Sequence, residues 1–118
     1  MFINFTNHPS AAWSDAQLCA AQAYGEITDI PFPMVDPFAD TQAVHELADK
    51  FAAQIIELAP DCVLCQGEFS LAFAVVERLK RQGLKVVVAC SNRRVSEELV
   101  DGVTRKIVEF VFCGFREY

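Results

Sequence analysis

The sequence lacks the features that mark most exported or membrane-bound chains. Its first residues, Met1–Thr6, carry no basic segment and no apolar run of signal-peptide length. No apolar stretch approaches the roughly 18 to 20 residues that a membrane span requires. Low-complexity and charge-block segments are also missing, so we expect no disordered region. These absences predict a cytoplasmic protein without a membrane partner.

Fingerprints of several enzyme classes are missing as well. There is no G-x-G-x-x-G or Walker pattern, so nothing points to a dinucleotide or nucleoside triphosphate site. The G-x-S-x-G elbow of many hydrolases is absent. The two histidines, His8 and His45, lack the spacing of metal ligands, and His45 falls on the polar side of a predicted helix. We therefore expect no cofactor and no metal ion.

The five cysteines do not form a recognisable disulfide framework, because their number is odd and they sit in apolar runs. Cys62 and Cys65 form a C-x-x-C pair, which elsewhere marks redox or zinc sites. Here the pair lies inside a predicted strand, where residues three apart point to opposite faces. No second C-x-x-C or histidine pair accompanies it. The pattern favours buried, reduced thiols.

Charge is unevenly distributed along the chain. The net charge is −6, yet residues 1–77 hold eleven acidic residues and one basic residue, and residues 78–118 hold nine basic and five acidic ones. An acidic total argues against duplex nucleic acid as a partner. A small anionic ligand stays compatible with it, because the charge of a site and that of the whole molecule are separate properties.

What the sequence does contain is an alternation of strand and helix patterns. Its 118 residues are 53% apolar and include ten Phe, which suits one domain, residues 1–118, with a hydrophobic core. A capping box begins at Ser14, and Gly25 and Gly83 stand where helices end. The predicted strands cover residues 2–6, 26–30, 62–65 and 85–90, and the predicted helices cover residues 15–24, 41–58 and 68–82. This order predicts an α/β fold, a Rossmann-like and mainly parallel sheet flanked by about three helices.

The last quarter of the sequence predicts a C-terminal β-hairpin. Asp101-Gly102 stands between two strand-like runs, residues 95–99 and 104–112, which is a strong hairpin signal. We expect the second run to be well buried, and residues 91–94 to be a loop that leaves the preceding strand. Phe110, Phe112 and Phe115 offer a stacking surface for bases, and the alternative, which spacing of this kind favours, is one face of a core strand.

Three polar segments follow predicted strands at the edge where open α/β sheets bind ligands. The first, residues 6–10, offers the hydroxyls of Thr6 and Ser10, the amide of Asn7 and the imidazole of His8, which acts as acid or base near pH 7. The alternative interpretation is a turn shaped by Asn7 and Ser10, with His8 solvated.

The second polar segment contains Gln66, Gly67 and Glu68, followed by Phe69. Gly67 permits close approach of a ligand to the backbone, and a helix N-terminus supplies free N–H groups for an anion. Glu68 has two interpretations. It is an acidic residue of the first helical turn, or it binds a ligand hydroxyl or serves as a base.

The third polar segment, residues 91–94, is the best candidate for binding an anion. Arg93 and Arg94 are adjacent, so in extended chain they point apart and one of them faces the cleft. The guanidinium group suits phosphate, and Ser91 and Asn92 add donors. The alternative is a pair of solvated arginines at the start of a hairpin.

Several segments resemble a group of small proteins found beside type III CRISPR systems. They are Ile3–Ser10 with Trp13, Tyr24–Pro33, Gln66–Glu68 and Phe115–Tyr118. The resemblance implies a Rossmann-like, CARF-related domain that recognises cyclic oligoadenylate second messengers. Some members of this group are ring nucleases, which need no metal: a ribose 2′-OH attacks the adjacent phosphate in line and leaves a 2′,3′-cyclic phosphate.

Carried onto this sequence, the resemblance implies catalytic roles for His8, Ser10 and Arg93. It implies ligand contacts for Thr6, Asn7, Gln66, Gly67, Glu68, Phe69, Ser91, Asn92 and Arg94. The two-fold symmetry of such rings favours a homodimer or a higher homo-oligomer. An acidic chain with Glu68 in the pocket is unusual for a polyanion binder.

Two other functions fit the sequence. One is a non-catalytic nucleotide-binding or protein-interaction module of a defence system, in which the basic hairpin pairs with a partner or with itself. The other is an unrelated enzyme in which His8 and Glu68 act as an acid–base pair on a phosphorylated or carboxylated substrate.

Overall fold

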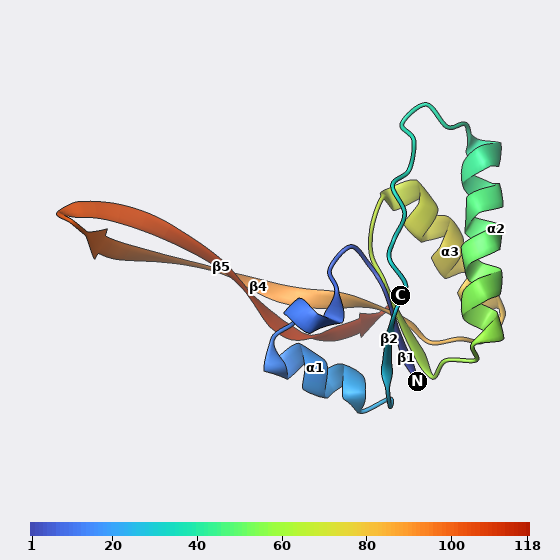
Figure 1. Cartoon of the computed structure of the whole chain (residues 1–118), viewed down its shortest axis with the longest axis horizontal. Helices are drawn as coiled ribbons and strands as arrows, with labels where there is room; N and C mark the ends of the chain where they lie inside the picture. Colours follow the sequence, from blue (N-terminus) through green and yellow to red (C-terminus); the bar gives the residue numbers. More distant parts are fainter.

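Five strands form a single sheet, and three α-helices and one 3-10 turn connect them in the computed structural model of residues 1–118 (Figure 1). The strands are β1 (Phe2–Phe5), β2 (Ile27–Asp29), β3 (Cys62–Cys65), β4 (Val86–Val100) and β5 (Val103–Glu117); the helices are η1 (Ser10–Ala12), α1 (Asp15–Gln22), α2 (Thr41–Glu57) and α3 (Phe69–Arg81). The strand order is β2-β1-β3-β4-β5. The first four strands are parallel, and β5 is antiparallel to β4. The predicted α/β class and C-terminal hairpin are confirmed.

Helices cover both faces of the sheet near its centre. The larger core joins α2 and α3 to residues such as Ile3, Phe5 and Val63. The smaller core joins α1 to Phe2 and Leu64 on the opposite face. Neighbouring residues of one strand therefore enter different cores, as strand geometry requires. All four residues of β1 and of β3 are buried, as expected for central parallel strands.

The helix boundaries follow local signals in the sequence. The Ser14 hydroxyl accepts the N–H of Gln17 at the start of α1, and the Asp40 carboxylate accepts the N–H of Ala43 at the start of α2. Gly25 and Gly83 follow α1 and α3 with φ of 107° and 77°, a region that favours glycine. The helices differ from their predicted ranges by at most two residues at either end.

The C-x-x-C pair is split between the two cores. Cys62 packs in the α1 core and Cys65 in the core of α2 and α3, so the expectation of opposite faces is confirmed. Burial raises the pKa of Cys62 to about 11 and that of Cys65 to about 12. Both side chains are therefore protonated thiols at neutral pH, and they do not share a site.

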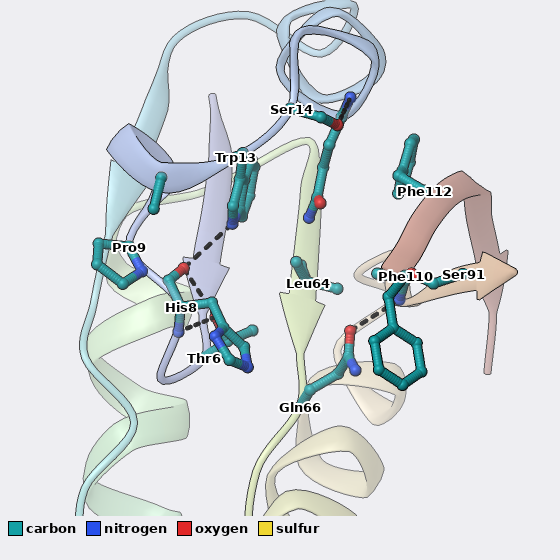
Figure 2. Close-up of a pocket in the computed structure, with 13 residues that line it drawn as sticks. Thr6, His8, Pro9, Trp13, Ser14, Leu64, Gln66, Ser91, Phe110 and Phe112 are labelled. Atoms are coloured by element: carbon teal, nitrogen blue, oxygen red, sulfur yellow. Dashed lines mark hydrogen bonds between the residues drawn. The ribbon is translucent and has the colours of Figure 1, made fainter. Parts of the chain in front are cut away.

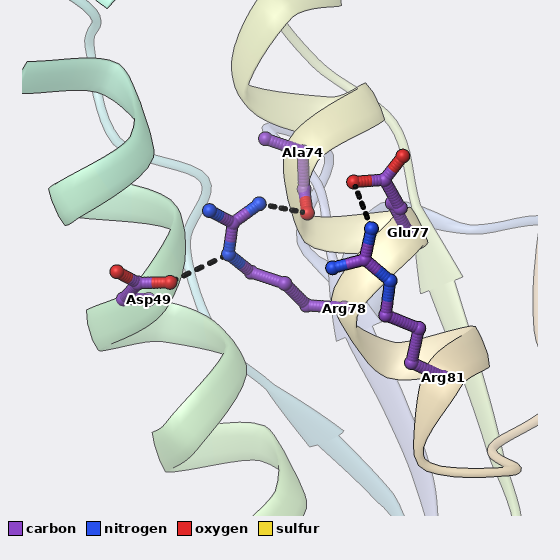
Figure 3. A network of polar contacts seen from close by, with 5 residues as sticks. All are labelled: Asp49, Ala74, Glu77, Arg78 and Arg81. Atoms are coloured by element: carbon purple, nitrogen blue, oxygen red, sulfur yellow. Dashed lines mark hydrogen bonds and ion pairs between the residues drawn. The ribbon is translucent and has the colours of Figure 1, made fainter. Parts of the chain in front are cut away.

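Basic residues of α3 are engaged in local pairs. The Arg78 Nε donates to the Asp49 carboxylate of α2 at 2.6 Å, and a second Arg78 nitrogen donates to the Ala74 carbonyl (Figure 3). Arg81 pairs with Glu77 one helical turn away at 3.1 Å. Pairs this exposed contribute little to stability, about 0–1 kcal/mol. Part of the basic excess of residues 78–118 is thus neutralised by acidic residues of the chain itself, so it does not require a ligand.

The segment Ser91–Arg94 is not a loop, so that prediction was wrong. Residues 91–94 continue β4 without a break and pair with residues 109–112 of β5. The register shifts between Cys90 and Ser91, which leaves Cys113 as an extra residue in β5. The polar composition of this segment reflects its exposure in a two-stranded ribbon and not a change of chain direction.

Residues 91–112 form a long twisted ribbon, which we call the arm, that projects from the body (Figure 1). Asp101 and Gly102 close it in a two-residue turn with φ of 51° and 75°, as the Asp-Gly signal predicted. The expectation that residues 104–112 are well buried was wrong: Phe110 is 71% exposed and Val108 45%. No helix covers the outer part of the arm, and the molecule is 54 Å long as a result.

No helix of the structure combines the length and the apolarity that a bilayer crossing requires. His45 is exposed on α2, as its position on the polar side of the predicted helix indicated.

Candidate functional site

A cavity of about 580 Å³ opens beyond the carboxyl ends of β1 and β3, on the side of α1. After β1 the chain crosses through α1 to β2, and after β3 it crosses through α3 to β4. The two connections run to opposite sides of the sheet and cover opposite faces. Such a reversal is the point at which open α/β sheets bind their ligands. The strand order, which local sequence patterns did not predict, thus places the cavity there.

The cavity is lined by aromatic rings and uncharged polar groups. Figure 2 shows Trp13 and His8 on one side and Phe110 and Phe112 on the other. The polar lining residues are Thr6, His8, Ser14, Gln17, Gln66 and Ser91. Neither lysine nor arginine is among the residues that form the wall. A cavity of this size with a wall of aromatic rings and uncharged polar groups is typical of small-ligand sites.

The loop after β1 is held in shape by a buried amide. Asn4 is 1% exposed, and its Nδ2 donates to the His8 carbonyl at 2.9 Å and to the Asp29 carboxylate at 3.0 Å. The Thr6 hydroxyl donates to Asn4 Oδ1 at 2.8 Å and accepts the His8 N–H. The Trp13 indole donates to the same His8 carbonyl at 3.1 Å. This network fixes the backbone of His8, while no hydrogen bond within the chain engages its imidazole.

The carboxylate of Asp29, at the end of β2, binds the C-terminal end of the same loop. Its Oδ2 accepts both the N–H and the hydroxyl of Ser10 at 3.1 Å. The Ser10 hydroxyl is therefore engaged by Asp29, and Ser10 is not among the residues that line the cavity. Asn7 is exposed and also lies outside the lining. The sequence predicted that all four of these polar residues belong to one site. The structure places Thr6 and His8 in the cavity wall and leaves Asn7 and Ser10 outside it.

Gln66 connects the end of β3 to β4. Its Oε1 accepts the N–H of Ala89 at 2.8 Å, at a position where the two strands no longer pair. The two N–H groups of the same amide remain available to a ligand in the cavity. Gln66 thus presents a donor whose orientation the β4 backbone fixes.

Gly67 is required by packing and not by a ligand. A Cβ at this position would lie 2.5 Å from the ring of Phe32, which packs against Phe5 in the core. The close approach that the sequence suggested at Gly67 is thus made by a core aromatic ring. Neither Gly67 nor Phe69 lines the cavity, and Phe69 is 91% exposed on the opposite side of the sheet edge.

Glu68 caps α3. Its carboxylate accepts the N–H groups of Ser70 and Leu71 at 3.0 and 2.8 Å, and also the Ser70 hydroxyl. The Ser70 hydroxyl, together with these N–H groups, lowers the pKa of the Glu68 carboxyl. Of the two interpretations of Glu68, the structure supports the helix-terminal acid. Glu68 does not line the cavity that holds His8, so the structure gives no support to an acid–base pair of the two.

The arm brings one arginine to the margin of the cavity. Ser91 and Phe110 line the wall, and Arg93 stands directly opposite Phe110 in the ladder. Side chains alternate along a strand, so Arg93 projects from the same ribbon face as Ser91, one step further out. Asn92 and Arg94 project from the other face. The prediction that one arginine of the pair faces the cleft fits Arg93.

Sequence reasoning named Phe110 and Phe112 as stacking residues but favoured a core face for them, and it did not predict Trp13, Ser14 or Gln17 in the wall. Trp13 and Ser14 precede α1, and Gln17 lies in its first turn, so all three reach the cavity through the placement of α1. The single tryptophan beside a helix cap, directly after the first strand-end loop, was the available signal. The N-terminus of α1 adds free N–H groups near the cavity, which favour a negative charge.

The structure contains no group of three or more His, Cys, Asp or Glu residues arranged to hold a metal ion. The thiols of Cys62 and Cys65 face different cores and so do not converge on one point.

Comparison with protein families gives one match, over residues 1–116. The chain belongs to the uncharacterized protein MJ1673 family. The match spans the sheet, all three helices and the arm. A search of curated proteins found no match.

Proposed function

We propose that the cavity beyond β1 and β3 binds a nucleotide ligand, a cyclic oligoadenylate of the kind that the sequence resemblance implies. The lining carries the argument: aromatic rings from Trp13 and Phe110 stand beside the amide of Gln66 and the hydroxyl of Ser91. Purine rings stack on aromatic side chains, and their edges bind amides and hydroxyls.

Two groups on the margin of the cavity would bind the phosphates of the ligand. Arg93 extends the ribbon face of Ser91 and Phe110 outward, and the N-terminus of α1 begins at Ser14 in the wall. One guanidinium and one helix terminus suit a ligand with few phosphates per site. The two-fold symmetry of such rings is the reason to expect a symmetric assembly of two copies.

Ring cleavage, if it follows binding, would rest on His8. Its imidazole lines the cavity on a backbone held by Asn4 and Trp13. Neutral imidazole would accept the proton of a ribose 2′-OH as that oxygen bonds to the adjacent phosphorus; the bond to the 5′ oxygen breaks, and that oxygen takes a proton from water. Ser10 has no part in this proposal, because its hydroxyl is donated to Asp29.

The experiment is to incubate the protein with labelled cyclic tri-, tetra- and hexa-adenylate without metal, and to separate bound, intact and linear species. Retention of an intact ring supports a binding protein, and linear product that disappears in His8→Ala supports a ring nuclease. No retention of any ring would overturn the proposal. Phe110→Ala should weaken retention, whereas Phe69→Ala, at a residue that is also largely exposed but lies outside the cavity, should not.

A further inference from the structure

The arm has two free edges along its outer part. β5 is the last strand of the sheet and pairs with β4 alone, and β4 pairs with β3 only at Val86 and Val87. Each edge presents a row of backbone N–H and C=O groups without partners, which is a template for a further strand. No charged bulge or proline interrupts β5 between Val103 and Phe112.

The arm also lacks the cover that a ribbon of this length needs. A two-stranded hairpin is marginally stable in water by itself. Apolar side chains nevertheless lie exposed on both of its faces: Val95 and Val108 face one way, and Val103 faces the other. The arm is therefore built to be covered by another chain.

Charge favours a second copy of this chain as the occupant. The arm carries four basic and four acidic residues, Arg93, Arg94, Arg105 and Lys106 with Glu97, Glu98, Asp101 and Glu109, so it is neutral. The whole −6 charge of the molecule thus lies in the body. Two copies that meet through their projecting arms keep the acidic bodies apart, whereas a contact between the bodies would bring like charges together.

We propose that β5 of one chain pairs antiparallel with β5 of a second copy, with Ile107 opposite the partner's Ile107 on the two-fold axis. Arg105 then lies opposite the partner's Glu109, and the symmetry repeats that ion pair. Val103 lies opposite the partner's Val111. Side chains alternate, so these residues share one face, where apolar and oppositely charged pairs follow each other.

The registers with the axis two residues away on either side are less favourable. An axis at Arg105 sets two arginines opposite each other, and an axis at Glu109 does the same with two glutamates; like charges in such positions are destabilising. With the axis at Ile107, the partner's turn also ends level with Phe112, just before the irregularity at Cys113. The free length of β5 thus matches the length of strand that the partner supplies.

The first test is a disulfide cross-link in a Cys19→Ser, Cys113→Ser background, which removes the two exposed thiols. Ile107→Cys should give a covalent dimer on mild oxidation, because the two residues face each other on the axis. Val108→Cys is the matched control: its counterpart lies diagonally across the pair, beyond the roughly 7 Å between Cα atoms that a disulfide allows. Equal cross-linking of both variants, or none with Ile107→Cys, would overturn the register.

The second test needs no cysteine. Sedimentation velocity of the unmodified protein, without ligand, should show a dimer at micromolar concentration. Ile107→Asp sets two carboxylates opposite each other on the axis and should give a monomer; Val108→Asp, which meets the partner's Lys106, should remain a dimer. A monomeric unmodified protein overturns the proposal. Because no nucleotide is present, this outcome is independent of whether the cavity binds a cyclic oligoadenylate.

Discussion

Arg93 and Phe110 are cross-strand partners in the β4–β5 ladder, and Phe110 forms part of the cavity wall. Their pairing means that the two strands of the arm place a ring in the wall and a cation beside it on the same face of the ribbon. The next arginine, Arg94, pairs with Glu109 on the other face of the ribbon. The two adjacent arginines thus project from opposite faces of the ribbon, and only Arg93 shares the face of the cavity-lining Phe110.

The two arginines give a matched pair of substitutions. Arg93→Ala should weaken binding of a cyclic oligoadenylate by about 1.5–3 kcal/mol, the usual contribution of a hydrogen bond to a charged group. Arg94→Ala removes the same charge from the neighbouring position and should leave affinity nearly unchanged. Isothermal titration of both variants measures the difference. Equal losses would mean that arm charge acts at long range, and that Arg93 has no contact with the ligand.

Asn4 should be a stability determinant of the site although it does not line the cavity. It is buried and makes three hydrogen bonds, to Thr6, His8 and Asp29. Asn4→Ala leaves these groups short of a partner and should lower the free energy of unfolding by about 1–3 kcal/mol. Urea denaturation measures this loss.

The control for that variant is Asn7→Ala in the same loop. Asn7 is exposed, and its side chain makes no hydrogen bond within the chain, so its removal should change stability by less than about 0.5 kcal/mol. A loss as large as that of Asn4→Ala would show that the loop is stabilised in some other way than through the Asn4 amide.

The elements of this fold could be predicted because their signals are local. Ser14 and Asp40 cap helices, Gly25 and Gly83 end them, and Asp101 turns the hairpin with Gly102. The strand order could not be predicted, since it depends on contacts between residues far apart in sequence. Alternation of apolar residues in 104–112 shows that the run is a strand, but the same pattern arises whether the apolar face meets the core or a second chain.

The candidate site could be predicted only in part for the same reason. The rule that ligands bind beyond strand ends predicted Thr6, His8, Gln66 and Ser91, which the structure brings together around the cavity. The rule does not say which sheet face is open. The covering of one face by α2 and α3 moves Glu68 and Phe69 away from the cavity, and the placement of α1 and the arm supplies the aromatic wall.

Gly67→Ala should destabilise the fold through Phe32. The added Cβ would lie 2.5 Å from the Phe32 ring, which is 4% exposed and has little room to move. Overpacking of this kind costs about 1–3 kcal/mol. In a Phe32→Leu background the clash is relieved, so Gly67→Ala should cost clearly less there, and a double-mutant cycle by urea unfolding measures the coupling. Additive losses would contradict this contact.

Glu68 should make stability depend on pH in acid solution. Its hydrogen bonds to Ser70 and Leu71 lower the pKa of the carboxyl in the folded state below its ordinary value of 4.5. The stabilisation by the cap is therefore fully present above that value, and is lost as pH falls through the lower, folded-state pKa. At neutral pH, Glu68→Ala should reduce the free energy of unfolding by about 0.5–2 kcal/mol, as expected for a lost helix cap.

The measurement for Glu68 is the difference in unfolding free energy between the unmodified protein and Glu68→Ala, taken from neutral pH downward. The difference should be constant above the ordinary glutamate pKa and shrink at lower pH, because protonation removes from the unmodified protein the interaction that the variant already lacks. Ser70→Ala removes the hydroxyl that contributes most to the shift, so it should move the midpoint of this loss to higher pH. A difference that persists unchanged in acid would show that the Glu68 side chain stabilises α3 through packing, without its charge.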